Sequence, residues 1–84
     1  MRFTVLYLAR LRDVLGCGNE QIELPDASTV SALINSLRDR GGAWAIELAA
    51  GRAVRVAVNQ EMTEVTAALS DGDEVALFPP VTGG

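Results

Sequence analysis

FTVLYL, residues 3–8, is a short apolar run rich in aromatic and β-branched residues. Such a run is typical of a strand buried in the middle of a sheet. A second run, EVALF at residues 74–78, alternates so that Val75 and Leu77 share one face while Phe78 lies on the other. We therefore predict that the first and last elements of the chain are strands.

The residues between these two runs predict one main helix, two shorter helices and further strands. An apolar stripe at helical spacing marks the main helix, which Ser28 or Thr29 can cap and a Gly-Gly pair ends. The expected helices span residues 9–15, 30–37 and 43–50, and the expected strands span 21–24, 52–58 and a short segment near 65–66. A turn is expected at residues 70–73, SDGD.

This order of elements is an α+β pattern, in which one main helix packs across one face of a mixed sheet and short extra helices flank it. With the first and last strands side by side, the arrangement is the ubiquitin-like β-grasp. We expect residues 1–78 to form this domain. Residues 79–84, PPVTGG, should project as a flexible, extended Gly-Gly tail, because the two prolines lack the amide hydrogens that a strand ladder needs.

Composition excludes several classes of function. Seven Lys+Arg against eleven Asp+Glu give a formal net charge of −4. The chain therefore lacks the positive field that binding to nucleic acid requires. It has no apolar stretch long enough to span a membrane, and one unpaired thiol fits a reducing compartment, so we expect a cytoplasmic protein with no membrane partner.

Few side chains are suited to catalysis. The seven cations are all Arg, there is no Lys or His, and Cys17 is the only thiol. Without a neighbouring base, Cys17 is interpreted as a structural thiol rather than a nucleophile. The acids Asp71, Asp73 and Glu74 are interpreted as parts of a turn, because they offer too few fixed oxygen ligands for a metal. We therefore predict no metal site and no catalytic side chain.

The carboxylate of Gly84 is the remaining chemical group of interest. Six extended residues span roughly 20 Å at ~3.3 Å each, which is enough to carry this carboxylate into the active site of a partner. Glycines lack Cβ, so Gly83 and Gly84 can pass a narrow channel. Adenylation gives the carboxylate a leaving group, which sulfur can replace to form a thiocarboxylate. The alternatives are a frayed terminus or a binding module with an inert tail.

VALFPPVTGG at residues 75–84, preceded by DGDE at 71–74, closely resembles the C-terminus of the small subunits of molybdopterin synthase. AVNQ at residues 57–60 and ARLR at 9–12 resemble segments of the same family. The similarity covers essentially the whole chain and is strongest after residue 54. It implies a sulfur carrier of β-grasp fold that is not itself an enzyme.

The resemblance also implies a set of partners. A ubiquitin-activating-like adenylyltransferase uses ATP to activate Gly84, which becomes a transient acyl-AMP and then a thiocarboxylate with sulfur from a donor protein. No cofactor is expected to bind stably. The large synthase subunit, in a heterotetramer of two small and two large subunits, receives the tail and supplies the catalytic groups. The sulfur then builds the dithiolene of molybdopterin from precursor Z.

The tail and its root supply the candidate site residues. By position in the family, Gly84 carries the sulfur and Gly83 is needed for passage into the partner. Three further tail residues are expected to contact partners: Pro80, Val81 and Thr82. Strand alternation also places Phe78 away from the helix-covered face, where it can anchor a partner. The alternative is that twist or a bulge buries Phe78 against Trp44 or Tyr7.

Three other functions remain open. Carriers for thiazole formation in thiamine synthesis and for tRNA thiolation also end in Gly-Gly, although PPVT at residues 79–82 favours the molybdopterin carrier. A ubiquitin-like modifier, joined by an amide bond to a target lysine, is the third. Intact mass distinguishes a carrier, in which sulfur replaces one oxygen, from a modifier, which forms larger conjugates.

Overall fold

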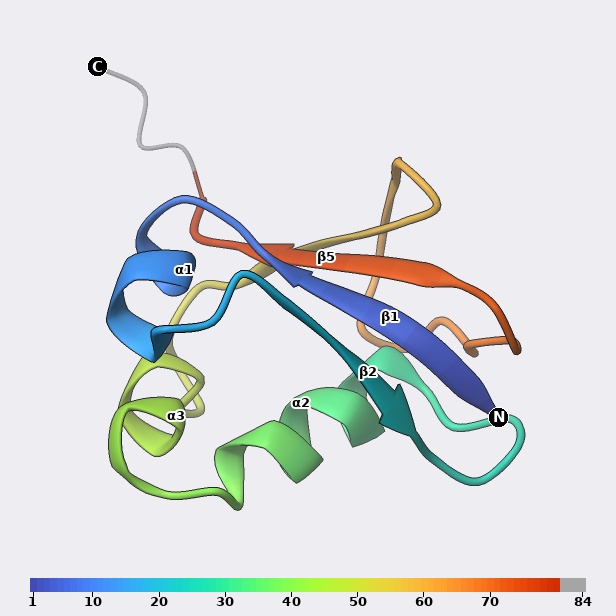
Figure 1. Ribbon diagram of the computed structural model, residues 1–84, viewed down its shortest axis with the longest axis horizontal. Coiled ribbons are helices and arrows are strands. Elements are labelled where there is room, and N and C mark those ends of the chain that lie inside the picture. The colour runs from blue at the N-terminus through green and yellow to red at the C-terminus, as the bar shows by residue number, and fades with distance from the viewer. Residues whose placement is uncertain (81–84) are drawn as a thin grey trace.

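A computed structural model describes residues 1–80. In this part of the chain, five strands form one mixed sheet and three helices accompany it (Figure 1). The strands are β1 (Arg2–Tyr7), β2 (Asn19–Glu23), β3 (Arg55–Val58), β4 (Glu61–Thr63) and β5 (Glu74–Phe78), and the helices are α1 (Arg10–Leu15), α2 (Val30–Arg38) and α3 (Gly42–Glu47). None of these helices is long and apolar enough to cross a membrane.

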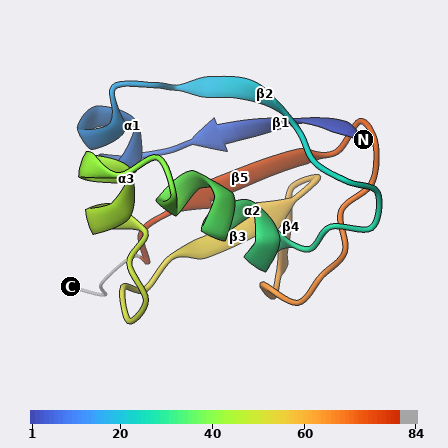
Figure 2. The ribbon, with the colours of Figure 1, turned by 90° about the horizontal axis from the view of Figure 1, so that it is seen from below.

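The sheet has the strand order β2-β1-β5-β3-β4, so the last strand lies between the first and the third. β1 and β5 are parallel, with Val5 opposite Val75 and Tyr7 opposite Leu77, and the other neighbouring strands are antiparallel. Figure 2 shows α2 lying across one face of this sheet. The first and last strands thus pair as a β-grasp requires, which confirms the predicted α+β fold.

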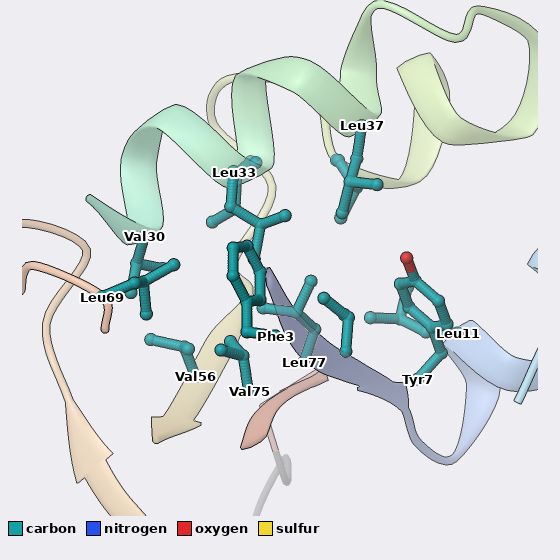
Figure 3. Packing of buried hydrophobic residues seen from close by; sticks show 13 residues of the cluster. Phe3, Tyr7, Leu11, Val30, Leu33, Leu37, Val56, Leu69, Val75 and Leu77 are labelled. Atoms are coloured by element: carbon teal, nitrogen blue, oxygen red, sulfur yellow. The ribbon is translucent and has the colours of Figure 1, made fainter. Parts of the chain in front are cut away.

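The core lies between α2 and the sheet (Figure 3). Thr29 caps the N-terminus of α2, one of the two predicted caps, because its Oγ1 accepts a hydrogen bond of 3.2 Å from the Ala32 amide. The fully buried aliphatic and aromatic side chains are Phe3, Val5, Tyr7, Val30, Leu33, Leu37, Leu48, Val75 and Leu77. Burial of a side chain of this size contributes roughly 1.5–3 kcal/mol. Both predicted core residues of the last strand are among them, so the core fixes the position of β5.

The β3–β4 hairpin differs from the sequence-based prediction. A short strand was expected near residues 65–66, but that segment is a turn in which the Ala67 amide donates to the Glu64 carbonyl at 3.0 Å. The strand lies earlier, at Glu61–Thr63. Asn59 and Gln60, with φ of 52° and 70°, form a two-residue connection in which both φ values are positive, as a type I′ turn requires. Gln is unusual there, so the sequence carried a weak turn signal.

Other element boundaries shift by a few residues. β2 begins at Asn19 rather than at residue 21, and β3 begins at Arg55 rather than at residue 52. The third helix spans Gly42–Glu47 instead of residues 43–50, and it starts from a turn in which Gly41 has φ of 77°. That backbone region favours glycine, which explains why Gly41 stands between α2 and α3.

A polar cluster ties β2 to the turn between α2 and α3. The Tyr7 hydroxyl donates to Glu20 Oε2 at 2.8 Å, and Arg40 donates to both carboxylate oxygens of Glu20 at 2.9 and 2.8 Å. The ring of Trp44 packs edge-on against Tyr7, with centroids 5.3 Å apart, and Arg40 lies 4.4 Å over the Trp44 ring. Hydrogen bonding from Arg40 lowers the pKa of Glu20, and burial followed by the Glu20 hydrogen bond raises the pKa of Tyr7.

Glu20→Gln is expected to reduce the acid sensitivity of the fold. The pKa of Glu20 is lower in the folded chain than the ordinary value of 4.5. Its ionised form therefore contributes stability that is complete above that ordinary value and is lost as pH falls through the folded value. In urea denaturation at pH about 7 and about 3, the wild type should lose more unfolding free energy than the variant.

The matched control is Glu23→Gln on the same strand, whose ion pair with Arg2 is exposed at both side chains. Exposed pairs contribute little, so this variant should keep the acid sensitivity of the wild type. Equal losses for the wild type and Glu20→Gln would contradict the assignment to Glu20.

Candidate functional site

The candidate site begins where β5 leaves the sheet. The Leu8 amide donates to the Leu77 carbonyl at 3.0 Å, and Arg55 lies opposite Phe78 in the β3–β5 register. β5 is therefore held on both sides up to its last residue. Pro79 and Pro80 follow and are half-buried, and neither has an amide hydrogen to extend the ladder. This tail root, Pro79–Pro80, thus leaves from a fixed point beside α1 (Figure 1).

Most of the predicted tail lies beyond the described residues. Val81, Thr82, Gly83 and Gly84 are outside the described range 1–80, so their roles stay predictions. The division into a domain of residues 1–78 and a flexible tail of residues 79–84 also stays a prediction. The end of β5 at Phe78 coincides with the proposed boundary.

The helix-free face of the sheet carries an apolar row that crosses four strands. Leu6 lies opposite Ala76, Ala76 opposite Ala57, and Ala57 opposite Met62. Side chains two residues apart on a strand share a face. Phe78, the last residue of β5, and Leu8, the residue after β1, therefore lie on this face as well. We call this set the outer apolar face: Leu6, Leu8, Ala57, Met62, Ala76 and Phe78. The Met62 side chain is 58% exposed and that of Leu8 is 41% exposed. Leu6, Ala76 and Phe78 are half-buried, and Ala57 is buried between its neighbours. An apolar sheet face with exposed side chains at its edges is typical of interaction surfaces.

Phe78 lies on the outer face, where strand alternation placed it, and its side chain is half-buried. The alternative, burial against Trp44 or Tyr7, is not what the structure has, because those two rings pack against each other on the helix side. Sequence reasoning did not identify Leu8 or Met62. The alternation of side chains along β1 would have placed Leu8 on this face. Met62 could not be placed, because β4 was expected at another position.

A charged pocket lies beside the tail root. It has a volume of about 260 Å³, and its lining includes Arg10, Glu47 and Arg52 together with Pro79 and Pro80. The carboxylate Oε2 of Glu47 lies 3.3 Å from Nη2 of Arg10 and 3.9 Å from Nη2 of Arg52. We call these three charged residues and the pocket that they line the arginine pocket. No individual arginine was assigned from the sequence.

The remaining polar candidates have structural partners. Cys17 donates its thiol hydrogen to the Asn19 carbonyl at 3.3 Å. Asp71 accepts a hydrogen bond from the Arg2 amide, and Asp73 accepts one from the Ser70 amide, each at 2.8 Å. These carboxylates therefore hold the turn before β5. Within residues 1–80, no group of three or more His, Cys, Asp or Glu side chains is arranged to hold a metal ion.

Comparison with known proteins agrees with this fold and with the resemblance of the tail. A molybdopterin synthase sulfur carrier subunit of Haemophilus influenzae is 40% identical over 80 residues, covering 95% of this chain and 96% of that protein. The structure of a putative molybdopterin converting factor, subunit 1, from Pyrococcus furiosus matches with a TM-score of 0.80 and 31% identity over 96% of this chain and 99% of that one.

A chain in the complex of subunits 1 and 2 of the molybdopterin-converting factor from Helicobacter pylori also has this fold. It matches over 100% of both chains with a TM-score of 0.68, and at 24% identity it shows the fold alone. The model of the ThiS family matches residues 5–84, which is nearly the entire sequence. The chain belongs to the ThiS family.

Proposed function

We propose that this chain is the sulfur carrier subunit of a molybdopterin synthase and that the carboxylate of Gly84 carries the sulfur. The similarity to the Haemophilus influenzae carrier, at 40% identity along nearly the whole of both chains, supports the proposal. The observation that carries it is the placement of the tail root at the end of β5, a strand bonded on both sides. A carrier needs its reactive terminus to leave from such a fixed point.

Gly84 is loaded by partner proteins. An adenylating enzyme joins the Gly84 carboxylate to the AMP portion of ATP and releases pyrophosphate. A donor protein then delivers sulfur as hydrosulfide, which attacks the acyl carbon and displaces AMP, so that the terminus becomes a thiocarboxylate. Two loaded chains supply the two sulfur atoms of the dithiolene formed on precursor Z. This chain donates sulfur without catalysing the transfer, and no cofactor stays bound to it. Its single unpaired thiol fits the reducing cytoplasm, where we propose that it acts.

The outer apolar face docks on the large subunit. The 40% identical relative from Haemophilus influenzae is the sulfur carrier subunit of a molybdopterin synthase, which supports another subunit of that synthase as the partner. Phe78 belongs to the outer apolar face and directly precedes Pro79, so docking on this face brings the tail root to the partner. Four residues beyond Pro80 reach about 13 Å at ~3.3 Å each. Two small and two large subunits complete the proposed assembly.

Met62→Asp is expected to weaken binding to the purified large subunit roughly 30-fold, the equivalent of ~2 kcal/mol, because it places an unpaired charge in an apolar interface. The fold should remain intact, since the Met62 side chain is 58% exposed. Titration calorimetry measures the dissociation constants. Glu61→Gln, which changes the neighbouring exposed residue of β4, is the matched control and should bind as the wild type does.

A pull-down with the tagged wild-type chain tests the partner itself. Recovery of the large synthase subunit supports the proposal. Recovery of a thiazole synthase, with no large subunit, would assign the carrier to thiamine synthesis instead. Wild-type affinity of Met62→Asp would show that the docking surface lies elsewhere.

A further inference from the structure

Within residues 1–80, the charged side chains of the arginine pocket carry one more positive than negative charge. The pocket's one carboxylate, Glu47, is 8% exposed and lies beneath both guanidinium groups. Two positive charges on one negative charge leave a net charge of 2 − 1 = +1. The side chains of Arg10 and Arg52 are 62% and 48% exposed. Each guanidinium has five N–H donors, and the contacts with Glu47 involve one nitrogen of each. Donors therefore remain available at the surface.

The charge of the molecule is unevenly distributed along β1 and β5. At the start of β1, two positive charges, the Met1 amine and Arg2, lie near four carboxylates, which leaves a net charge of 2 − 4 = −2. The four are Glu23, Asp26, Asp71 and Asp73. Figure 1 shows the end of β5 at the opposite side of the molecule from the N-terminus. Pro79 and Pro80, which follow that end of β5, line the arginine pocket. The chain as a whole carries −4. The arginine pocket is thus a local positive site on an acidic protein.

We propose that the arginine pocket binds a surface carboxylate of the large subunit, at the mouth of the active site that receives the tail. The proposal rests on the function proposed above and adds a second contact to the outer apolar face. A guanidinium matches the two oxygens of a carboxylate and binds them as a pair. Pro79 and Pro80 line the same pocket, so an Asp or Glu side chain bound there lies against the tail root.

This contact also sets the orientation of docking. A carboxylate at this point of the large subunit would attract the end of the carrier that holds the tail root and repel the acidic end. Complementary charges of this kind steer two proteins as they meet and fix their relative orientation in the complex. The carrier therefore approaches with its tail toward the active site.

The test measures binding of full-length variants to the purified large subunit. A double variant, Arg10→Gln and Arg52→Gln, removes both guanidinium groups. It leaves the Glu47 carboxylate buried and without these ion-pair partners, which destabilises the fold. A triple variant that adds Glu47→Gln avoids this charge. We expect the triple variant to bind at least about tenfold more weakly than the wild type and to show a smaller dependence of affinity on salt.

Arg2→Gln is the matched control, because it removes one arginine charge at the opposite end of β1. It should bind within about twofold of the wild type. A folded triple variant with wild-type affinity and salt dependence would overturn the proposal, and so would an equal loss in Arg2→Gln. In both cases the wild type still binds the large subunit, so these results do not contradict the proposed function. Failure of the wild type to bind the large subunit would instead contradict that function, and this proposal with it.

Discussion

Deletion of Gly84 is expected to lower the rate of molybdopterin formation at least about 10²-fold while the chain still folds and docks. The deletion moves the terminal carboxylate back by ~3.3 Å. A misplacement of 1 Å at a reacting centre can already cost about 10²-fold. The assay combines the variant with ATP, the adenylating enzyme, the sulfur donor, the large subunit and precursor Z, and compares the yield with that of the wild type.

Cys17→Ser is the matched control for this deletion. It removes the only thiol of the chain, which donates its hydrogen to the Asn19 carbonyl, and leaves the terminus unchanged. We expect full activity and full thiocarboxylate loading, measured by intact mass. Retained activity after deletion of Gly84 would instead show that the tail is inert and that the chain acts as a binding module. Loss of sulfur loading in Cys17→Ser would indicate that the Cys17 side chain, and not Gly84, carries the sulfur.

Leu77→Ala is expected to lower the free energy of unfolding by ~2–5 kcal/mol, because it opens a cavity at a fully buried position. Leu77 lies on β5, opposite Tyr7 of β1 and Val56 of β3, and its side chain is 0% exposed. At roughly 0.05–0.15 kcal/mol per residue, the total stability of the chain is about 4–13 kcal/mol. The variant is therefore expected to be marginally folded and to lose the fixed position of the tail root.

Urea denaturation followed by circular dichroism measures this loss. Ile46→Ala is the control, because Ile46 lies in α3 and is 59% exposed, and its effect should stay within about 0.5 kcal/mol. A loss below about 1 kcal/mol in Leu77→Ala, with an unchanged denaturant slope, would contradict the role of Leu77 in the core.

The sequence predicted β5 to its last residue because two signals coincide there. Alternation separates Leu77 from Phe78, and Pro79 and Pro80 end the hydrogen-bonding ladder. The pairing of β1 with β5 followed from knowledge of folds, since periodicity alone does not specify strand order. The start of β4 was not predictable from composition, because the turn before it uses Asn59 and Gln60 in place of the usual Asn-Gly.

The sequence predicted the chemistry of the candidate site but not its surroundings. The role of Gly84 stays a prediction, which rests on the lack of reactive side chains and on the resemblance of the tail. The arginine pocket was not predictable, because Arg10 comes from α1, Glu47 from α3 and Arg52 from the segment before β3, and only the folded chain brings them together. Met62 joined the outer apolar face only once the β3–β4 register was known.

Transfer of sulfur from Gly84 is tested most directly with purified components. The chain loaded as the Gly84 thiocarboxylate is mixed with the large subunit and precursor Z, without ATP, adenylating enzyme or sulfur donor. We predict that molybdopterin forms and that the intact mass of the chain returns to that of the free carboxylate. No molybdopterin from the loaded chain, or an equal yield from the unloaded chain, would contradict the assignment of sulfur transfer to Gly84.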